Sequence, residues 1–307
     1  MGIVLRQSAK STIILFIGVL LGAALNYTYT FVLEKPELGF ITNIVNQAVL
    51  VYVFVLMGTS SVVVAYAPRF ADDEEKRKVL LTLSLFFPLI TMAIFVFLYI
   101  LLKEKIIEIY NINDQHYIRK YYYWLPVIAF IWMYTTLLEH YLISKKKAAV
   151  STLTREVVQR ACMVILIILF FFKKIDFSSF VMLMSLSYLF PFLIALIISI
   201  RNGLSLSLNF RALSRREYRQ LIHFSWYHML EGVAVIMLGY IDSLMLAPLA
   251  QDGMSSLSVY RNAIFATTLM IIPIRAINAS SFAVLNEAYI KNDNDKLNNL
   301  YSRINLN

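Results

Sequence analysis

The chain has 307 residues, of which 59% are hydrophobic and only 15% are charged, and its formal net charge is +9. Soluble domains carry about 25% charged residues, so this composition excludes an ordinary soluble protein. The apolar runs are about 20 residues long or longer, which predicts membrane-spanning α-helices rather than the strands of a β-barrel. Cys162 is the single cysteine, which excludes an intramolecular disulfide and a cysteine-based zinc site.

Eight apolar stretches follow one another along the chain. We expect membrane-spanning helices at 13–33, 38–67, 79–102, 121–140, 148–172, 177–200, 221–248 and 256–286. The predicted fold is therefore an all-α integral membrane protein with about eight transmembrane helices. We expect three parts: an N-terminal six-helix lobe (1–200), a basic cytoplasmic linker (201–219), and the first two helices of a second lobe with a polar tail (220–307).

Lysine and arginine are concentrated on one side of this predicted topology. Eight spans place both termini on the same side, together with the loops 68–78, 144–155 and 201–219, and most of the basic residues lie there. The positive-inside rule then predicts that both termini are cytoplasmic. The positive charge thus indicates membrane topology, and we expect a lipid bilayer and no nucleic acid as a partner.

Four charged residues interrupt the last two predicted spans, namely Glu231, Asp242, Arg261 and Arg275. A charge in the hydrocarbon layer costs roughly 2.5 kcal/mol or more unless it faces protein or water. The two acids lie within about 20° of a common helix face, and Asp242 is at a similar depth to Arg261 in an antiparallel hairpin. Glu231 and Arg275 lie at a second, deeper level. The four residues are either structural ion pairs or the lining of a polar cavity that holds an anionic head group and a cation; we favour the cavity.

Polar residues in two earlier spans are further candidates. Asn43, Asn46 and Gln47 form a stripe at i, i+3 and i+4, which indicates either bonds between neighbouring helices or a cavity lining. Glu156 and Arg160 are spaced i, i+4, which predicts an ion pair on one helix face, and Arg160 is also a cavity candidate.

Sequence motifs of common enzyme classes are missing from the predicted spans. None of the predicted spans contains an HExxH, GxSxG, P-loop or DxD-type motif, so metal-dependent hydrolysis, nucleophilic hydrolysis and ATP-driven pumping lack support. We expect no enzymatic activity, no cofactor and no metal site.

Several loose motifs stand in order along the chain. They are Pro68-Arg69-Phe70, Ile241-Asp242-Ser243, Gly253, Val259-Tyr260-Arg261-Asn262-Ala263, Ile272-Pro273 and a polar run from Asn292 to Asp295. Together with the order of the spans, these motifs resemble the bacterial polysaccharide flippases. That family comprises the O-antigen and capsule exporters of the multidrug/oligosaccharidyl-lipid/polysaccharide superfamily.

The resemblance implies an alternating-access translocator with two six-helix lobes around a central cationic cavity. It would carry an undecaprenyl-diphosphate-linked oligosaccharide, such as an O-antigen, capsule or exopolysaccharide repeat unit, across the bacterial cytoplasmic (inner) membrane. Coupling to Na⁺ or H⁺ and association with other polysaccharide-assembly membrane proteins are expected. The residues expected to bind substrate are Arg261, Arg275, Arg160, Asn46 and Gln47, and those expected to couple the ion are Asp242 and Glu231.

Other functions remain open at this point. They are a multidrug/cation antiporter or a peptidoglycan-precursor flippase of the same superfamily, a membrane glycosyl polymerase or ligase, and a non-transporting remnant. Inward-facing arginines favour an anionic substrate over a cationic drug, and the longest predicted outer connection, 103–120, is short for a polymerase. Members of the resembled family have about twelve to fourteen spans, so we expect that a polypeptide with eight is not a competent flippase alone.

Overall fold

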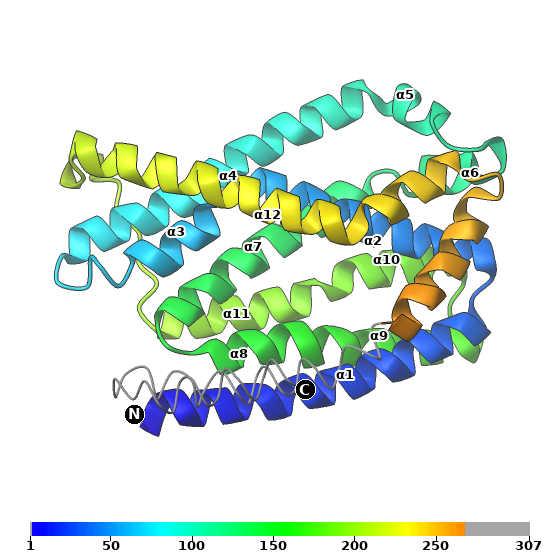
Figure 1. Ribbon diagram of the computed structural model, residues 1–307, viewed down its shortest axis with the longest axis horizontal. Coiled ribbons are helices and arrows are strands. Elements are labelled where there is room, and N and C mark those ends of the chain that lie inside the picture. The colour runs from blue at the N-terminus through cyan, green and yellow to red at the C-terminus, as the bar shows by residue number, and fades with distance from the viewer. Residues whose placement is uncertain (1, 268–307) are drawn as a thin grey trace, which may run out of the picture.

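The structure is a computed structural model, which describes the backbone of residues 2–267 and the side chains of residues 13–267. Every regular element in this part of the chain is helical, as expected for an all-α protein (Figure 1). The helices are α1 Gly2–Val32, α2 Lys35–Leu56, α3 Thr59–Tyr66, α4 Glu74–Leu101, α5 Lys103–Glu108, α6 Ile112–Tyr121, α7 Trp124–Ser144, α8 Ala148–Leu153, a π-helical turn Thr154–Val158, α9 Gln159–Phe171, α10 Phe177–Ser187, α11 Leu189–Arg201, a 3₁₀ turn Phe210–Ala212 and α12 Arg215–Leu249. Residues 253–267 are also helical.

Six of the predicted spans coincide with helices that are long and apolar enough to cross a membrane. These are Ile13–Val32, Lys35–Leu56, Glu74–Leu101, Trp124–Ser144, Phe177–Arg201 and Arg215–Leu249. The stretch 148–172 is helical too, but the π-helical turn divides it and it carries charged residues. The last predicted span begins in the helix 253–267, and its remainder, including Arg275, lies outside the described residues.

Helix α7 is the centre of the packing. It contacts α2, α3 and α11, while α1 lies along α8, the π-helical turn and α9. Its side chains Ile128, Met133 and Leu137 are almost completely buried in the main hydrophobic cluster, together with Phe40 and Phe180. Helix α12 runs along α2 and α3, so residues far apart in sequence lie side by side across the molecule (Figure 1).

The predicted span 38–67 is broken in the middle. Met57 and Gly58 have φ angles of 49° and 73°, which end α2 and begin α3. A Cβ atom on Gly58 would overlap the backbone carbonyl of Ser225 in α12, and the Ser225 hydroxyl donates a hydrogen bond to the carbonyl of Met57. Only glycine allows both the left-handed conformation and this close approach, so the break is where α12 crosses.

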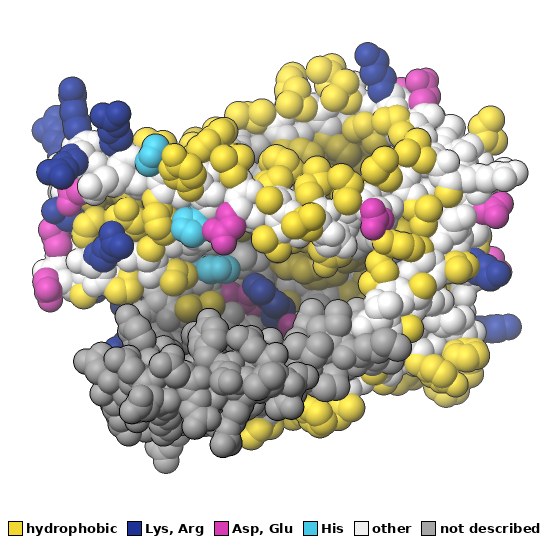
Figure 2. All heavy atoms as spheres, in the orientation of Figure 1, with side chains coloured by type: hydrophobic (Ala, Val, Ile, Leu, Met, Phe, Trp, Pro, Cys, Tyr) yellow, Lys and Arg dark blue, Asp and Glu magenta, His cyan; other side chains and the backbone are white. Residues whose placement is uncertain are grey.

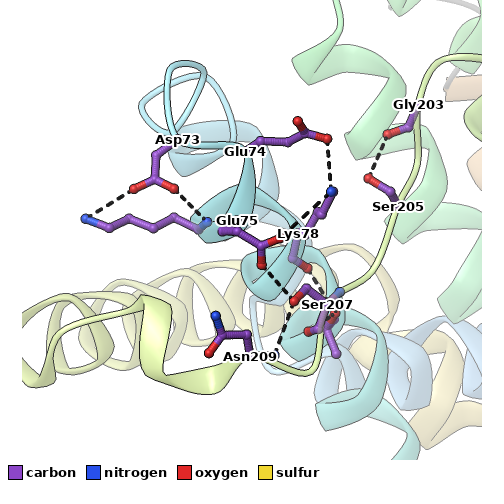
Figure 3. Close-up of polar contacts among 10 residues, drawn as sticks. Asp73, Glu74, Glu75, Lys78, Gly203, Ser205, Ser207 and Asn209 are labelled. Atoms are coloured by element: carbon purple, nitrogen blue, oxygen red, sulfur yellow. Dashed lines mark hydrogen bonds and ion pairs between the residues drawn. The ribbon is translucent and has the colours of Figure 1, made fainter.

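The expected linker 201–219 is tied to the start of α4. The Ser207 hydroxyl donates to Glu75 at 2.9 Å, and the backbone N–H of Ser207 donates to the Thr82 hydroxyl at 3.0 Å (Figure 3). Helix α12 also begins earlier than the predicted position 221, because Ser214 and Glu217 form a capping box. The end of the expected linker is thus the first turn of α12.

Candidate functional site

A cavity of about 520 Å³ lies between α1, α2, α9, α10, α12 and the helix 253–267. Its polar lining residues are Asn26, Tyr29, Thr42, Asn46, Gln159, Arg160, Tyr188, Tyr240 and Arg261. No aspartate or glutamate of the described chain lines it. Ligand clefts are commonly about 300–1,000 Å³, so this cavity is large enough for a polar ligand group.

Arg261 is the cation of this cavity that keeps free hydrogen-bonding capacity. Its guanidinium carbon lies 5.3 Å from the centre of the Tyr29 ring on α1, a cation–π distance. Its Nη1 atom is buried and has no hydrogen-bond partner within the described residues. Beside it, the Thr30 hydroxyl donates to the Asn262 side chain at 3.1 Å, which joins α1 to the helix 253–267. The site therefore presents a desolvated N–H donor to whatever enters the cavity.

Arg160 lines the same cavity, but protein groups already engage it. Its Nη2 lies 2.6 Å from a carboxylate oxygen of Glu156, so the predicted i, i+4 ion pair is confirmed. Its Nη1 also donates to the backbone carbonyl of Gly18 on α1. Because Glu156 compensates its charge, Arg160 contributes less net positive charge to the cavity than Arg261 does.

The predicted amide stripe on α2 splits between two environments. Asn46 lines the cavity, whereas Asn43 and Gln47 donate hydrogen bonds to the hydroxyl of Tyr110, which follows α5. Gln47 therefore does not line this cavity, because its side chain points to another face of α2, and its expected role in substrate binding stays a prediction. The side-chain oxygen of Gln159, another lining residue, is buried and has no hydrogen-bond partner among residues 13–267, while its amide nitrogen donates to Ser187 at 3.3 Å.

The two acids of α12 do not form the expected pairs with cavity arginines. Asp242 is exposed and accepts a hydrogen bond from the Tyr260 hydroxyl at 2.9 Å, so the expected Asp242–Arg261 pair is wrong. Glu231 is exposed and lies 2.8 Å from His228. Tyr240 points into the cavity, and both acids lie about 180–200° around the helix from it. The two acids share one face of α12, as predicted, but this face is opposite the one that carries Tyr240 and borders the cavity. The expected pairing of Glu231 with Arg275 lies outside the described residues.

Sequence reasoning missed the contribution of α1 to the cavity. Gly22, Leu25, Asn26 and Tyr29 all line it from one side of this helix. Their spacing of three and four residues is that of a single helix face, and it combines a small residue with polar ones inside an apolar span. That pattern is the signal that would have identified this wall.

Comparisons with known proteins place this geometry in a family. The sequence profile of a family described as polysaccharide biosynthesis protein matches residues 4–285. No curated protein matches the chain.

Solved structures of MATE transporters share the fold. An inward-facing multidrug resistance MATE family transporter of the MOP superfamily superimposes with a TM-score of 0.67 at 18% identity, covering 92% of this chain and 65% of that one. The outward-facing conformation of a multidrug resistance MATE family transporter superimposes with a TM-score of 0.62 at 18% identity, covering 97% of this chain and 67% of that one. A third structure is that of a MOP superfamily transporter from Pyrococcus furiosus, whose binding pocket is described as having reverse polarity. It superimposes with a TM-score of 0.62 at 18% identity and covers the same shares of the two chains.

The chain spans about two thirds of the length of these transporters, and its own sequence matches one family profile over nearly its whole length. It therefore belongs to the polysaccharide biosynthesis protein family, as a multi-pass membrane protein with the fold of the MATE transporters of the MOP superfamily.

Proposed function

We propose that this chain acts in the translocation of an undecaprenyl-diphosphate-linked oligosaccharide across the bacterial cytoplasmic membrane by alternating access. The observation that carries the proposal is the buried Nη1 atom of Arg261, which has no hydrogen-bond partner in the described part of the chain and lies in a cavity of about 520 Å³. A buried donor without an acceptor costs about 1–3 kcal/mol, and more when it is charged, so a ligand with acceptor oxygens would recover that free energy.

A diphosphate suits the donors that line this cavity. Arginine presents a fixed fork of N–H groups that bonds two phosphate oxygens at once and stays charged in a low-dielectric site. Arg261 would bind the diphosphate directly, and Arg160, held by Glu156, would add a second cationic side chain. Asn46, Gln159 and the tyrosine hydroxyls are suited to sugar hydroxyl groups, which both donate and accept hydrogen bonds.

The charge of the cavity argues against a cationic drug as substrate. A cavity that attracts cations would be lined by acids, whereas the described lining contains two arginines and no carboxylate. The Pyrococcus furiosus transporter, in which the reversed polarity of the binding pocket suggests a different function, is a precedent for such a difference within the superfamily. An anionic lipid-linked sugar therefore remains the better candidate, carried without enzymatic chemistry.

The remaining parts of the proposal follow from the sequence. We place residues 1–200 in a first six-helix lobe and residues 220–307 in a second one, with the substrate bound between them. The excess of Lys and Arg in the loops next to the termini supports a cytoplasmic location of both ends. Asp242 and Glu231 stay candidates for coupling to Na⁺ or H⁺, and they would have to act from a face of α12 outside the described cavity.

Binding of undecaprenyl diphosphate to the purified full chain in detergent micelles tests the role of Arg261. We expect Arg261→Ala to weaken binding about tenfold or more and Arg261→Lys to weaken it less, because lysine keeps the charge but loses the fork. Arg211→Ala, at an exposed position outside the cavity, is the control and should bind normally. Equal binding by the Arg261→Ala variant and the unmodified chain would refute the proposal.

A further inference from the structure

A second pocket, which we call the α3–α12 pocket, lies away from the central cavity. It has a volume of about 320 Å³ and is lined by Tyr66, Arg69, Gln220, His223, Phe224, Tyr227 and His228. Its centre on α12 lies roughly 24 Å along the helix from Tyr240, which lines the central cavity, at 1.5 Å per residue. No described residue lines both sites.

Aromatic rings form the wall of this pocket and hold its cation. The Tyr66 and Phe224 rings meet edge to face at 5.3 Å between centroids, and Phe224 lies 4.2 Å from the His228 ring. The guanidinium carbon of Arg69 lies 4.6 Å from the centre of the Tyr66 ring. A guanidinium held over a ring keeps its N–H groups available at its edge, so Arg69 is positioned as a donor.

Among the residues that the structure describes, the pocket is lined by hydrogen-bond donors and by no aspartate or glutamate. Arg69 forms no ion pair with a carboxylate of residues 13–267. His223 packs edge to face on Tyr227 at 4.8 Å, and in either tautomer its ring carries one N–H group. Glu231 lies outside the pocket, where it pairs with His228 at 2.8 Å and fixes the orientation of that ring. Gln220 and Tyr227 add an amide and a hydroxyl donor.

The pocket lies close to the end of the molecule where basic side chains gather. Figure 2 shows Lys and Arg concentrated at the end where α12 begins, with histidine side chains next to them on the same face. On α12, Arg215, Arg216 and Arg219 precede the pocket, while Ile222 and Trp226 are exposed apolar residues beside it. A site with a basic border and apolar neighbours is what the boundary between lipid head groups and acyl chains requires.

We propose that the α3–α12 pocket binds the phosphate group of a lipid head group. The Arg69 guanidinium would bond the phosphate oxygens, and His223, Gln220 and Tyr227 would be further donors. The aromatic wall would lie against the glycerol of the lipid. A lipid is favoured over free phosphate because the lining places apolar rings directly beside the donors. This inference goes beyond the translocation proposed above and does not depend on Arg261.

Binding of a fluorophore-labelled phosphatidic acid to the full chain, in micelles of a neutral detergent, tests the proposal. We expect Arg69→Gln to weaken binding about tenfold, and the double variant Arg69→Gln with His223→Gln to weaken it further. Arg216→Gln removes one charge from the same end of α12 without touching the pocket, so it should change binding less than threefold. Unlabelled phosphatidic acid should displace the labelled lipid, and millimolar inorganic phosphate should not.

Two outcomes would overturn the assignment. Equal weakening by Arg69→Gln and Arg216→Gln would mean that only the overall positive charge attracts the lipid. Displacement by inorganic phosphate as effective as by the lipid would mean that the pocket recognises free phosphate. The Arg261→Ala variant should bind phosphatidic acid normally, because Arg261 lines the central cavity and not this pocket. The result of this test is therefore independent of the result of the undecaprenyl diphosphate test.

Discussion

The carboxylate of Asp114 in α6 accepts a hydrogen bond from the backbone N–H of Met254 at 2.9 Å, although the two residues are far apart in the sequence. Beside them, the Asn111 amide donates to the carbonyl of Ala250 at 2.7 Å. Asp114 is 6% exposed and Met254 is fully buried. These bonds hold the turn after α12 against α6. In the alternating-access cycle proposed above, opening the molecule at this end requires them to break.

Asp114→Ala should destabilise the protein. The substitution leaves the buried N–H of Met254 without its acceptor, which costs about 1–3 kcal/mol of the free energy of unfolding. Thermal unfolding of the purified chain in detergent micelles measures the effect as a lower midpoint. Glu108→Ala is the control, because this exposed residue belongs to the same connection. Equal midpoints for Asp114→Ala and the unmodified chain would show that the bond contributes nothing to stability.

Asp114→Asn should differ from the unmodified chain in a pH-dependent way. Burial raises the pKa of the Asp114 carboxyl above its usual range, against the opposing effects of the Met254 N–H and of His116. The folded state therefore binds this proton more tightly than the unfolded state, so the stabilising contribution is complete below the unfolded pKa of about 3.9 and is lost as pH rises through the folded pKa. Asparagine keeps an acceptor oxygen without a charge. The stability of Asp114→Asn relative to the unmodified chain should thus increase between pH 4 and pH 7, and a constant difference would contradict this account.

Gly39→Ala should disrupt the same junction. A Cβ atom on Gly39, in the first turns of α2, would overlap the carbonyl oxygen of Met254, so the backbones must separate. We expect a loss of about 1–3 kcal/mol, typical of overpacking. Gly239→Ala is the matched control, because nothing lies within 4 Å of a Cβ placed there and alanine favours the helix. The midpoint of thermal unfolding should fall for the first variant and stay or rise for the second.

The fold class and most helix positions could be predicted from the sequence, because apolar runs of membrane-spanning length constrain it strongly. Breaks within these runs could not. The division at Met57 and Gly58 results from α12 crossing α2, which is a tertiary contact. The π-helical turn at Thr154–Val158 likewise lies in a predicted span, and its residue types are compatible with an uninterrupted α-helix.

The sequence predicted some features of the candidate site, namely those that depend on the geometry of a single helix, but not those that depend on contacts between helices. Helix periodicity gives the angle between two residues on one helix, and it correctly placed Glu231 and Asp242 on a common face. It does not give the direction of that face relative to other helices. Arg261 and Arg160 reach one cavity because α1 lies beside both α9 and the helix 253–267, a contact that no single span encodes.

The pair formed by the buried Glu139 and the half-exposed Arg155 should be needed for stability rather than for binding. Glu139 on α7 is 1% exposed, lies 2.6 Å from Arg155 and accepts a bond from Thr154 at 2.8 Å. Arg155→Met leaves this carboxylate buried without its cation, which should cost about 2–3 kcal/mol. Adding Glu139→Gln removes the uncompensated charge and should restore most of the loss.

An exposed pair provides the comparison. Arg119 and Glu104 lie 2.8 Å apart with 55% and 61% of their side chains exposed, so water screens this pair and Arg119→Met should lower the midpoint of thermal unfolding much less than Arg155→Met does. The measurement is the midpoint of thermal unfolding. It is compared among three variants, namely Arg155→Met, Arg155→Met with Glu139→Gln, and Arg119→Met. A double variant as unstable as Arg155→Met alone would show that burial of the Glu139 charge is not the cause.

Exchanging the charges of Asp242 and Arg261 should not restore function. Arg261→Asp removes the cation of the cavity and should abolish binding of undecaprenyl diphosphate. Adding Asp242→Arg places the new cation beside Tyr260, on the face of α12 opposite Tyr240, so binding should stay lost. The control is the exchange of Glu156 and Arg160, which contact each other at 2.6 Å on one helix face and should still pair, keeping the chain folded. Recovery of binding in the Asp242–Arg261 exchange would mean that the two side chains meet in the state that binds substrate, in contrast to the arrangement described above.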